Sequence, residues 1–211
     1  LQAEACGLAP HVDMNPVLLK PESDRCSQVV VLGKALAKQE ASAYYDERPR
    51  LWSVVTDSYA RLSRQYDVMV IEGAGSAAEV NLRKMDLVNW PVVEFADAQV
   101  LLVADIDRGG VFAQVVGTLD LLEPAERARV CGIIINKFRG DATLFADGVD
   151  FLESRTGIPV LGVVPFLRDL ILDQEDGLDL GRQLQTSFAS DRINIAVILL
   201  PYMSNFTDFN V

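Results

Sequence analysis

The run Val130-Cys131-Gly132-Ile133-Ile134-Ile135-Asn136 decides the fold, because it is almost continuously apolar over the length of one strand. Runs of this kind are typical of strands that a parallel sheet buries on both faces. Three further runs share this character, and they cover residues 67–72, 100–105 and 159–165. Segments with apolar residues at helical spacing alternate with them, at residues 50–66, 111–122 and 143–156. This alternation predicts an α/β fold with a doubly wound, mostly parallel sheet.

The composition is that of a globular protein. The chain has 211 residues, of which 50% are hydrophobic and 23% charged, and at roughly 150 residues per domain this predicts one domain plus a fraction. A net charge of -11 argues against a general nucleic-acid or anionic-membrane partner. Three cysteines and one histidine are too few for a disulfide framework or a cysteine–histidine zinc site. No signal peptide or membrane-spanning run is visible, so we expect a cytoplasmic protein.

Both ends of the sequence look internal. Residues 1–6 begin inside a helix-like segment without an initiator Met, and we expect further sequence upstream. The polar stretch 172–191 looks like a linker, and the apolar run 193–200 reads as the first strand of a second domain that continues downstream.

Carboxylates follow two of the predicted strands. Glu72 precedes the glycine-rich turn at residues 73–76, and Asp105 and Asp107 precede Arg108-Gly109-Gly110. A carboxylate fixed at the end of a buried strand is how nucleotide-hydrolysing folds hold Mg²⁺. Helix capping or a solvated position at the sheet rim is the alternative for each acid.

Two nucleotide motifs are only approximated. Residues 73–78 fit the dinucleotide fingerprint and Glu94 follows about 20 residues on, as in a dehydrogenase. We disfavour that interpretation because Glu72 directly precedes the first glycine and the segment after the loop is highly charged. Gly33-Lys34-Ala35 lacks the earlier glycine and the Ser or Thr of a Walker A motif, so the 211 residues contain no phosphate loop of that kind.

The third and fourth strands end in groups suited to a base. Asn136 offers both a donor and an acceptor, which match the edge of adenine, and the rim at Pro165 presents bare carbonyls. Simple capping explains an isolated Asn equally well.

Taken in order, these motifs resemble the cobyric acid synthase family, glutamine-dependent amidotransferases of cobalamin biosynthesis. The resemblance runs through essentially the whole chain, on the segments 11–21, 71–76, 104–110, 135–141 and 204–209. It implies a sheet of the P-loop NTPase or dethiobiotin synthetase-like type, truncated before residue 1. Residues 1–171 would be the ATP-dependent amidoligase domain without its phosphate loop, 172–191 the linker, and 192–211 the first strand of a truncated glutaminase domain.

The resemblance also implies a reaction. With ATP and Mg²⁺, the b, d, e and g carboxylates of adenosylcobyrinic acid a,c-diamide would be amidated through acyl phosphates, with ammonia from glutamine. The partners would be the corrinoid substrate and, through the C-terminal domain, glutamine. Alternatives are a related acyl-phosphate-forming ligase, such as cobyrinic acid a,c-diamide synthase or a dethiobiotin synthetase-like enzyme, and a non-catalytic nucleotide-sensing module.

The expected site residues follow from the resemblance together with the strand-end pattern. We expect a metal ligand at Glu72 and catalytic carboxylates at Asp86, Asp105 and Asp107. We expect nucleotide contacts at Gly73, Gly75, Asn136, Lys137, Pro165 and Leu167. We expect substrate contacts at Asn15, Lys20 and Arg108.

The remaining expectations concern the basic residues, the histidine and the cysteines. Arg108 is the best candidate for an anion contact, since Gly109 and Gly110 begin a helix whose N–H groups add to its charge; Arg25, Arg83 and Lys84 could equally be solvated. His11 reads as structural or close to the substrate. Cys6, Cys26 and Cys131 all lie outside a G-x-C-x-G context, so no glutamine nucleophile is present and we expect this chain alone to be inactive.

Overall fold

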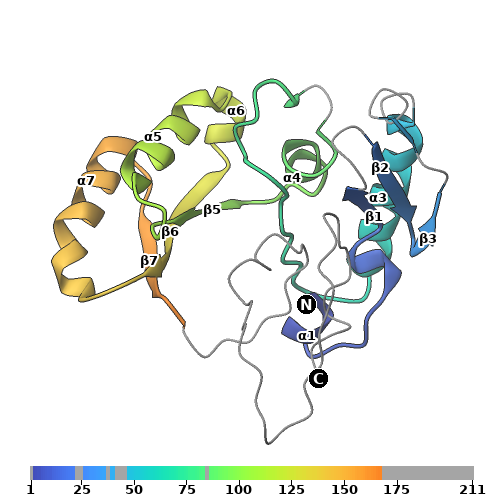
Figure 1. Cartoon of the computed structure of the whole chain (residues 1–211), viewed down its shortest axis with the longest axis horizontal. Coiled ribbons are helices and arrows are strands. Elements are labelled where there is room, and N and C mark those ends of the chain that lie inside the picture. The colour runs from blue at the N-terminus through green and yellow to red at the C-terminus, as the bar shows by residue number, and fades with distance from the viewer. Residues whose placement is uncertain (1, 22–25, 37–38, 41–46, 84–85, 168–211) are drawn as a thin grey trace, which may run out of the picture. The chain divides into compact units, whose positions relative to one another are not determined.

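The computed structural model describes residues 2–21, 26–36, 39–40, 47–83 and 86–167 (Figure 1). These residues form two compact units, which divide between Gln65 and Tyr66. Unit 1 is the part up to Gln65 and unit 2 the part from Tyr66. The predicted linker at 172–191 and the predicted strand at 193–200 lie outside the described residues. The domain boundaries expected from the sequence therefore stay predictions.

Unit 1 contains an antiparallel sheet that the sequence patterns did not predict. β2 pairs with β1, β3 and β4, in every case antiparallel. The elements of this unit are α1 (Gln2–Ala5), η1 (Val12–Met14), β1 (Val17–Pro21), β2 (Cys26–Val31), β3 (Lys34–Ala35), β4 (Gln39–Glu40) and α3 (Arg48–Leu62). The last of these confirms the helix predicted over residues 50–66.

A tight turn joins β2 to β3. Leu32 and Gly33 both have positive φ, at 47° and 74°, and Val31 pairs with Lys34 across them. Two consecutive residues with positive φ make the turn whose twist suits an antiparallel hairpin. Gly33-Lys34-Ala35 is thus a hairpin connection, in agreement with the rejection of a phosphate loop there.

Unit 2 is built on a parallel sheet with strand order β5-β6-β7 (Figure 1). Helix α5 follows β5 and α7 follows β6, so each parallel connection crosses through a helix, as expected. The α/β class is therefore confirmed. The elements are α4 (Trp90–Phe95), β5 (Val100–Asp105), α5 (Val111–Leu121), α6 (Pro124–Arg127), β6 (Val130–Phe138), η3 (Ala142–Phe145), α7 (Ala146–Thr156) and β7 (Val160–Pro165).

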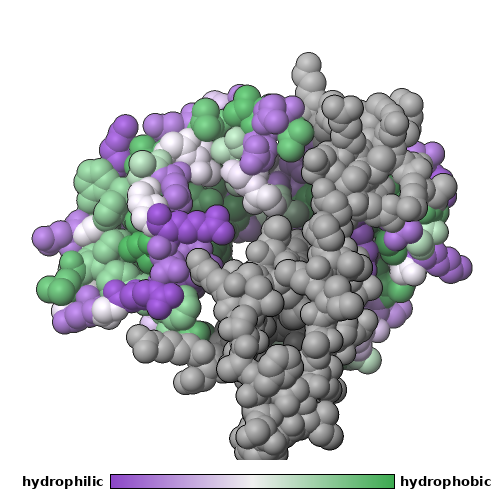
Figure 2. Space-filling model, in the orientation of Figure 1, coloured by the Kyte–Doolittle hydropathy of each residue, from purple (hydrophilic) through white to green (hydrophobic). Residues whose placement is uncertain are grey.

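The core of unit 2 lies between this sheet and the helices α5 and α7. Ile133 and Ile135 of β6 are fully buried, as are Val115 and Leu119 of α5 and Leu152 of α7, to within 1%. Helix α7 ends at Gly157, whose φ of 72° and N–H bond to the carbonyl of Glu153 form the expected C-terminal stop. Figure 2 shows that green, hydrophobic surface remains over α5 and α7, where Leu121 and Phe151 are at least half exposed.

Burial on both faces of the sheet was predicted and is not found in the described residues. Leu101 and Val103 of β5 and Leu161 of β7 are 48%, 56% and 58% exposed. Their neighbours along each strand face the helices instead. An apolar run indicates that both faces of a strand can be buried. It does not reveal which segment of the chain would pack against the second face.

The strand predicted over residues 67–72 is also wrong. The structure assigns no strand there, and Val68 and Val70 are 77% and 92% exposed. A strand exists only when a neighbour pairs with its backbone, and within the described residues β5, β6 and β7 pair only with one another. Hydrophobicity alone cannot supply that partner. No helix among the described residues combines the length and apolarity needed to cross a bilayer.

Candidate functional site

The carboxyl ends of the three parallel strands bring several predicted residues together. Asp105 at the end of β5 pairs with Asn136 of β6, and Phe138 of β6 pairs with Pro165 of β7. Ligands of open α/β sheets bind at this edge. We call the loops and strand ends at this edge the sheet rim.

Strand β6 is irregular where it reaches the rim. Lys137 has a φ of 62°, and the pairing with β7 shifts register between Ile135 and Phe138. The Lys137 N–H donates to Asn136 Oδ1 over 2.8 Å. Irregularities of this kind re-aim side chains beside functional sites, and a left-handed non-glycine residue costs on the order of 1–3 kcal/mol.

The Lys137 ammonium lies on Asp105. Its Nζ donates to Asp105 Oδ2 over 2.8 Å, and the backbone N–H of Asp107 donates to the other oxygen over 2.9 Å. The hydrogen bond from Lys137 lowers the pKa of Asp105, against a smaller opposing effect of burial. Asp105 is thus ionised at neutral pH and already engaged on both oxygens.

Asp107 is engaged in the same way by Arg139. Arg139 Nε donates to Asp107 Oδ1 over 2.6 Å, and this bond lowers the pKa of Asp107. The guanidinium carbon of Arg139 lies 3.4 Å from the centre of the Phe166 ring. Sequence analysis pointed to Asp107 and to the rim around Phe166, but it did not predict the contact of Phe166 with Arg139, which joins loops after two different strands.

The loop after Asp107 leads into α5 through two glycines. Gly109 and Gly110 have φ values of 76° and 70°, and Gly110 caps the helix. The preceding Arg108 is exposed and its charge contributes to the lowered pKa of Asp105. This matches the expected arrangement of Arg108 beside a helix start; its role as an anion contact stays a prediction.

Asn89 holds the glycine-rich loop in place. Its Oδ1 accepts from the Ala74 N–H over 3.2 Å, and its Nδ2 donates to the Ala74 carbonyl over 2.9 Å. A Cβ on Gly73 would clash with Asn89 Oδ1, so a glycine lets Asn89 approach the loop this closely. Trp90 Nε1 donates to the Ala77 carbonyl over 2.7 Å. No sequence pattern singled out Asn89, because its bonds join residues 15 positions apart.

Asp86 orders the segment that carries Asn89. Its Oδ1 accepts from the N–H groups of Val88 and Asn89, and its Oδ2 from that of Trp90, over 2.8, 2.9 and 3.0 Å. The last of these bonds satisfies the N–H of Trp90, the first residue of α4. The expected catalytic role of Asp86 stays a prediction.

Arg83 is not a solvated charge, because it pairs with Glu123 at 2.7 Å.

Glu72 differs from Asp105 and Asp107. It is exposed, and no hydrogen bond or ion pair holds its carboxylate within the described part of the chain. It follows an extended segment rather than a strand, while Gly75 has a φ of 67°. No group of three or more His, Cys, Asp or Glu residues poised for a metal occurs among the described residues. Pro165 and Leu167 are exposed at the rim, and their nucleotide contacts stay predictions.

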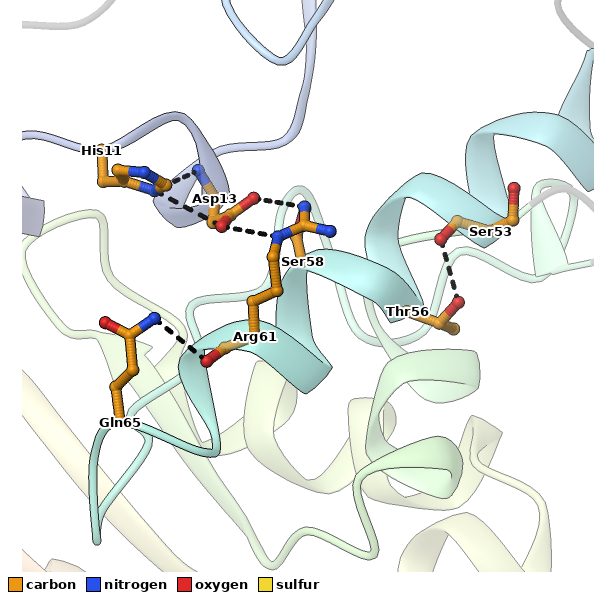
Figure 3. Close-up of polar contacts among 7 residues, drawn as sticks. All are labelled: His11, Asp13, Ser53, Thr56, Ser58, Arg61 and Gln65. Atoms are coloured by element: carbon orange, nitrogen blue, oxygen red, sulfur yellow. Dashed lines mark hydrogen bonds and ion pairs between the residues drawn. The ribbon is translucent and has the colours of Figure 1, made fainter.

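Unit 1 contains a separate buried charge (Figure 3). Only 3% of the Asp13 side chain is exposed, and Arg61 of α3 donates to both of its oxygens, from Nε over 2.9 Å. Arg61 also donates to the buried Ser58 over 3.0 Å. His11 Nδ1 accepts from the Asp13 N–H over 3.3 Å, which supports a structural role. Sequence analysis missed Arg61. The only sequence feature that hints at its contacts is its spacing of three residues from Ser58, which places the two on one face of a helix.

The two predicted substrate contacts of unit 1 flank this cluster along the chain. Asn15 is exposed and ends η1, and Lys20 pairs with Gln28 in the β1–β2 ladder. The structure neither assigns nor excludes their predicted role. Arg25 and Lys84 lie outside the described residues.

Comparison with known families places the fold. Residues 12–174 match the family model described as an AAA domain. This match covers most of the chain, so the chain belongs to the AAA domain family. The expectation of a fold of the P-loop NTPase type is thereby confirmed. No solved structure matches the chain significantly.

Curated relatives carry a more particular name. The chain is 56% identical over 209 residues to the cobyric acid synthase of Yersinia enterocolitica, 52% over 213 residues to that of Syntrophobacter fumaroxidans, and 54% over 211 residues to that of Citrobacter koseri. These matches cover 99–100% of the chain and 41% of each relative. The chain thus spans about two-fifths of the length of these relatives, and the resemblance seen in the sequence motifs is confirmed.

Proposed function

We propose that this chain supplies the ATP-using synthetase part of a cobyric acid synthase, an amidating ligase of cobalamin biosynthesis. One observation carries the proposal: 52–56% identity to proteins of that name over nearly the whole chain. The engaged charges at the sheet rim of an AAA domain are consistent with a nucleotide site.

The proposed reaction converts carboxylates into amides. An oxygen of a substrate carboxylate attacks the γ-phosphorus of ATP, ADP leaves, and an acyl phosphate forms. The nitrogen of ammonia then attacks the acyl carbon, inorganic phosphate leaves, and a proton is lost from nitrogen. Activation is needed because an ionised carboxylate has no adequate leaving group at neutral pH. The acceptors would be the b, d, e and g carboxylates of adenosylcobyrinic acid a,c-diamide, with glutamine as the source of ammonia.

Among the three candidate acids, the donor chemistry fits Mg²⁺ at Glu72 better than at Asp105 or Asp107. Asp105 and Asp107 already accept from Lys137 and Arg139, whereas the Glu72 carboxylate is exposed and unengaged within the described residues. Mg²⁺ in nucleotide sites takes one or two carboxylates and completes its shell with phosphates and water. When bound, the ion would neutralise phosphate charge during phosphoryl transfer.

The base of ATP would lie at the ends of β6 and β7. Asn136 would hydrogen-bond the adenine edge beside Lys137, and the exposed rim from Pro165 to Leu167 would frame it. Gly73 and Gly75 let the backbone approach phosphates closely. We infer these roles from the chemistry of the groups and from the strand pairing.

A substrate with many carboxylates needs cations, because the chain has a net charge of -11. Arg108 and Lys20 would supply positive charge, and Asn15 would supply hydrogen bonds. Asp86 would stand near the acceptor carboxylate, where it could orient ammonia. Residues 1–171 would form the synthetase domain, and 192–211 would begin the glutaminase domain. The enzyme would work in the cytoplasm.

The test is turnover by the intact protein. With ATP, Mg²⁺, glutamine and the corrinoid a,c-diamide, we expect ADP release and up to four new amides by mass spectrometry. Glu72→Gln should abolish most turnover and raise the Mg²⁺ requirement, whereas Glu79→Gln, on a nearby exposed acid, should not. ADP release triggered by a different carboxylic acid, and not by the corrinoid, would favour another acyl-phosphate ligase.

A further inference from the structure

Arg139 is fixed in an unusual way for a surface arginine. Two of its nitrogens, Nε and Nη2, lie 2.6 and 3.5 Å from the two oxygens of Asp107. At the same time its guanidinium carbon is 3.4 Å from the centroid of the Phe166 ring. Half of the side chain remains exposed, at 50%.

The aromatic partner is itself anchored. The Phe166 N–H donates to the Phe138 carbonyl over 2.8 Å, which extends the β6–β7 pairing beyond Pro165. Phe166 therefore follows the end of β7 in a fixed position, and Arg139 directly follows β6. The two residues meet at the rim that also carries Asn136.

These contacts use one edge and one face of the Arg139 guanidinium. A guanidinium binds anions through its N–H fork, and Asp107 already occupies the Nε and Nη2 edge of that fork. One planar face covers the Phe166 ring. The opposite face has no ring against it in the part of the chain that the structure describes. A flat group with this second face open is suited to stacking on another flat group, and the comparison of two ligands below distinguishes stacking from anion binding by the remaining N–H groups.

We propose that the purine base of the nucleotide stacks on the open face of Arg139. Phe166 packs against the opposite face of the guanidinium, and Asp107 fixes its orientation. This inference rests on the proposed function and adds to it a role for Arg139, which is not among the expected site residues. Arg139 would hold the base in plane while Asn136 reads its edge. Asp107 would be a positioning residue that fixes the guanidinium.

The experiment compares two ligands of the intact protein, ATP and inorganic tripolyphosphate, which has the phosphates without the base. Binding of each is measured at equilibrium for wild type, Arg139→Ala, Arg139→Lys and Phe166→Leu. Arg155→Ala is the matched control, because it removes an exposed arginine of α7 from the same unit. Thermal melting of each variant reports whether it is folded.

A stacking role predicts a loss that depends on the base. Arg139→Ala and Arg139→Lys should both weaken ATP binding roughly tenfold, because stacking on a base is worth about 1–3 kcal/mol, while tripolyphosphate binding changes less than about twofold. Phe166→Leu should weaken ATP in the same selective way. Arg155→Ala should leave both affinities unchanged.

Other outcomes overturn the proposal, and they separate it from the proposed function. If Arg139→Lys binds ATP like wild type, or if Arg139→Ala weakens both ligands equally, Arg139 acts as a charge. If wild type binds ATP and no variant alters its affinity, the base lies elsewhere and the proposed function still stands. If wild type binds neither ligand, the proposed function fails and the proposed stacking fails with it.

Discussion

At the scale of single residues, Asp13 carries the clearest energetic consequence. Its carboxylate is 3% exposed and accepts two hydrogen bonds from Arg61. Asp13→Asn should lower the free energy of unfolding by about 1–3 kcal/mol, because charge-assisted bonds are lost at a buried position. Urea unfolding measures this, with Glu47→Gln as control. Glu47 pairs with an Arg50 side chain that is 64% exposed, so the control should cost less than about 1 kcal/mol.

The same residue predicts a pH dependence. The hydrogen bond from Arg61 lowers the pKa of Asp13 below its ordinary value of 3.8. The carboxylate therefore stabilises the fold fully above that value, and the stabilisation is lost as the pH falls below it through the lowered folded pKa. Melting temperatures followed from pH 6 down to pH 3 should fall more steeply for wild type than for Asp13→Asn. Parallel curves would show that Asp13 does not sense pH in this range.

Gly73 tests whether the clamp by Asn89 orders the glycine-rich loop. Gly73→Ala would place a Cβ against Asn89 Oδ1 and should cost roughly 1–2 kcal/mol, since the two bonds to Ala74 cannot both survive. Gly117→Ala in α5, where a Cβ meets nothing within 4 Å, should be neutral or stabilising. In an Asn89→Ala background the cost of Gly73→Ala should largely vanish. Equal costs in both backgrounds would mean that the strain at Gly73 has another source.

At the scale of elements, β6 predicts a difference between two substitutions at one position. Lys137→Val and Lys137→Gly both remove the pair with Asp105, but only glycine accepts a φ of 62° without strain. Lys137→Val should therefore be the less stable variant by about 1–3 kcal/mol in urea unfolding. Equal stabilities would show that β6 straightens when its lysine is removed.

The elements also show what sequence patterns can and cannot predict. Helices α3, α5 and α7 and strands β5, β6 and β7 were predicted within a few residues, because each has a period or an apolar run of its own. Residues 67–72 have an equally apolar run and form no strand, since pairing depends on a neighbour that local sequence does not reveal. The antiparallel sheet of unit 1 was missed; its strands β3 and β4 have two residues each, too few to show a period.

The candidate site, like the fold, was only partly predictable from the sequence. Strand-end logic brought Asp105, Asn136 and Pro165 to one edge, because parallel strands end together. It could not predict the contacts of Phe166 and Asn89, which depend on where loops from distant segments meet.

At the scale of the whole molecule, the absence of a Walker A motif from the 211 residues predicts weak nucleotide binding by this chain alone. A phosphate loop supplies the backbone N–H groups and the lysine that hold the β- and γ-phosphates. The isolated chain, supplied with ATP, Mg²⁺, ammonia and the corrinoid, should release no ADP above background. An intact protein assayed alongside is the control, and turnover by the isolated chain would show that the rim suffices.

The carboxylate of Asp86 has a consequence for the exchange of backbone protons with solvent. It accepts three consecutive N–H groups, those of Val88, Asn89 and Trp90. A backbone proton exchanges only after its hydrogen bond opens, and a single rotation of this side chain opens all three together. The three amides should therefore exchange in deuterium oxide as one group with similar protection. Their common exchange rate would report how often the segment that carries Asn89 opens.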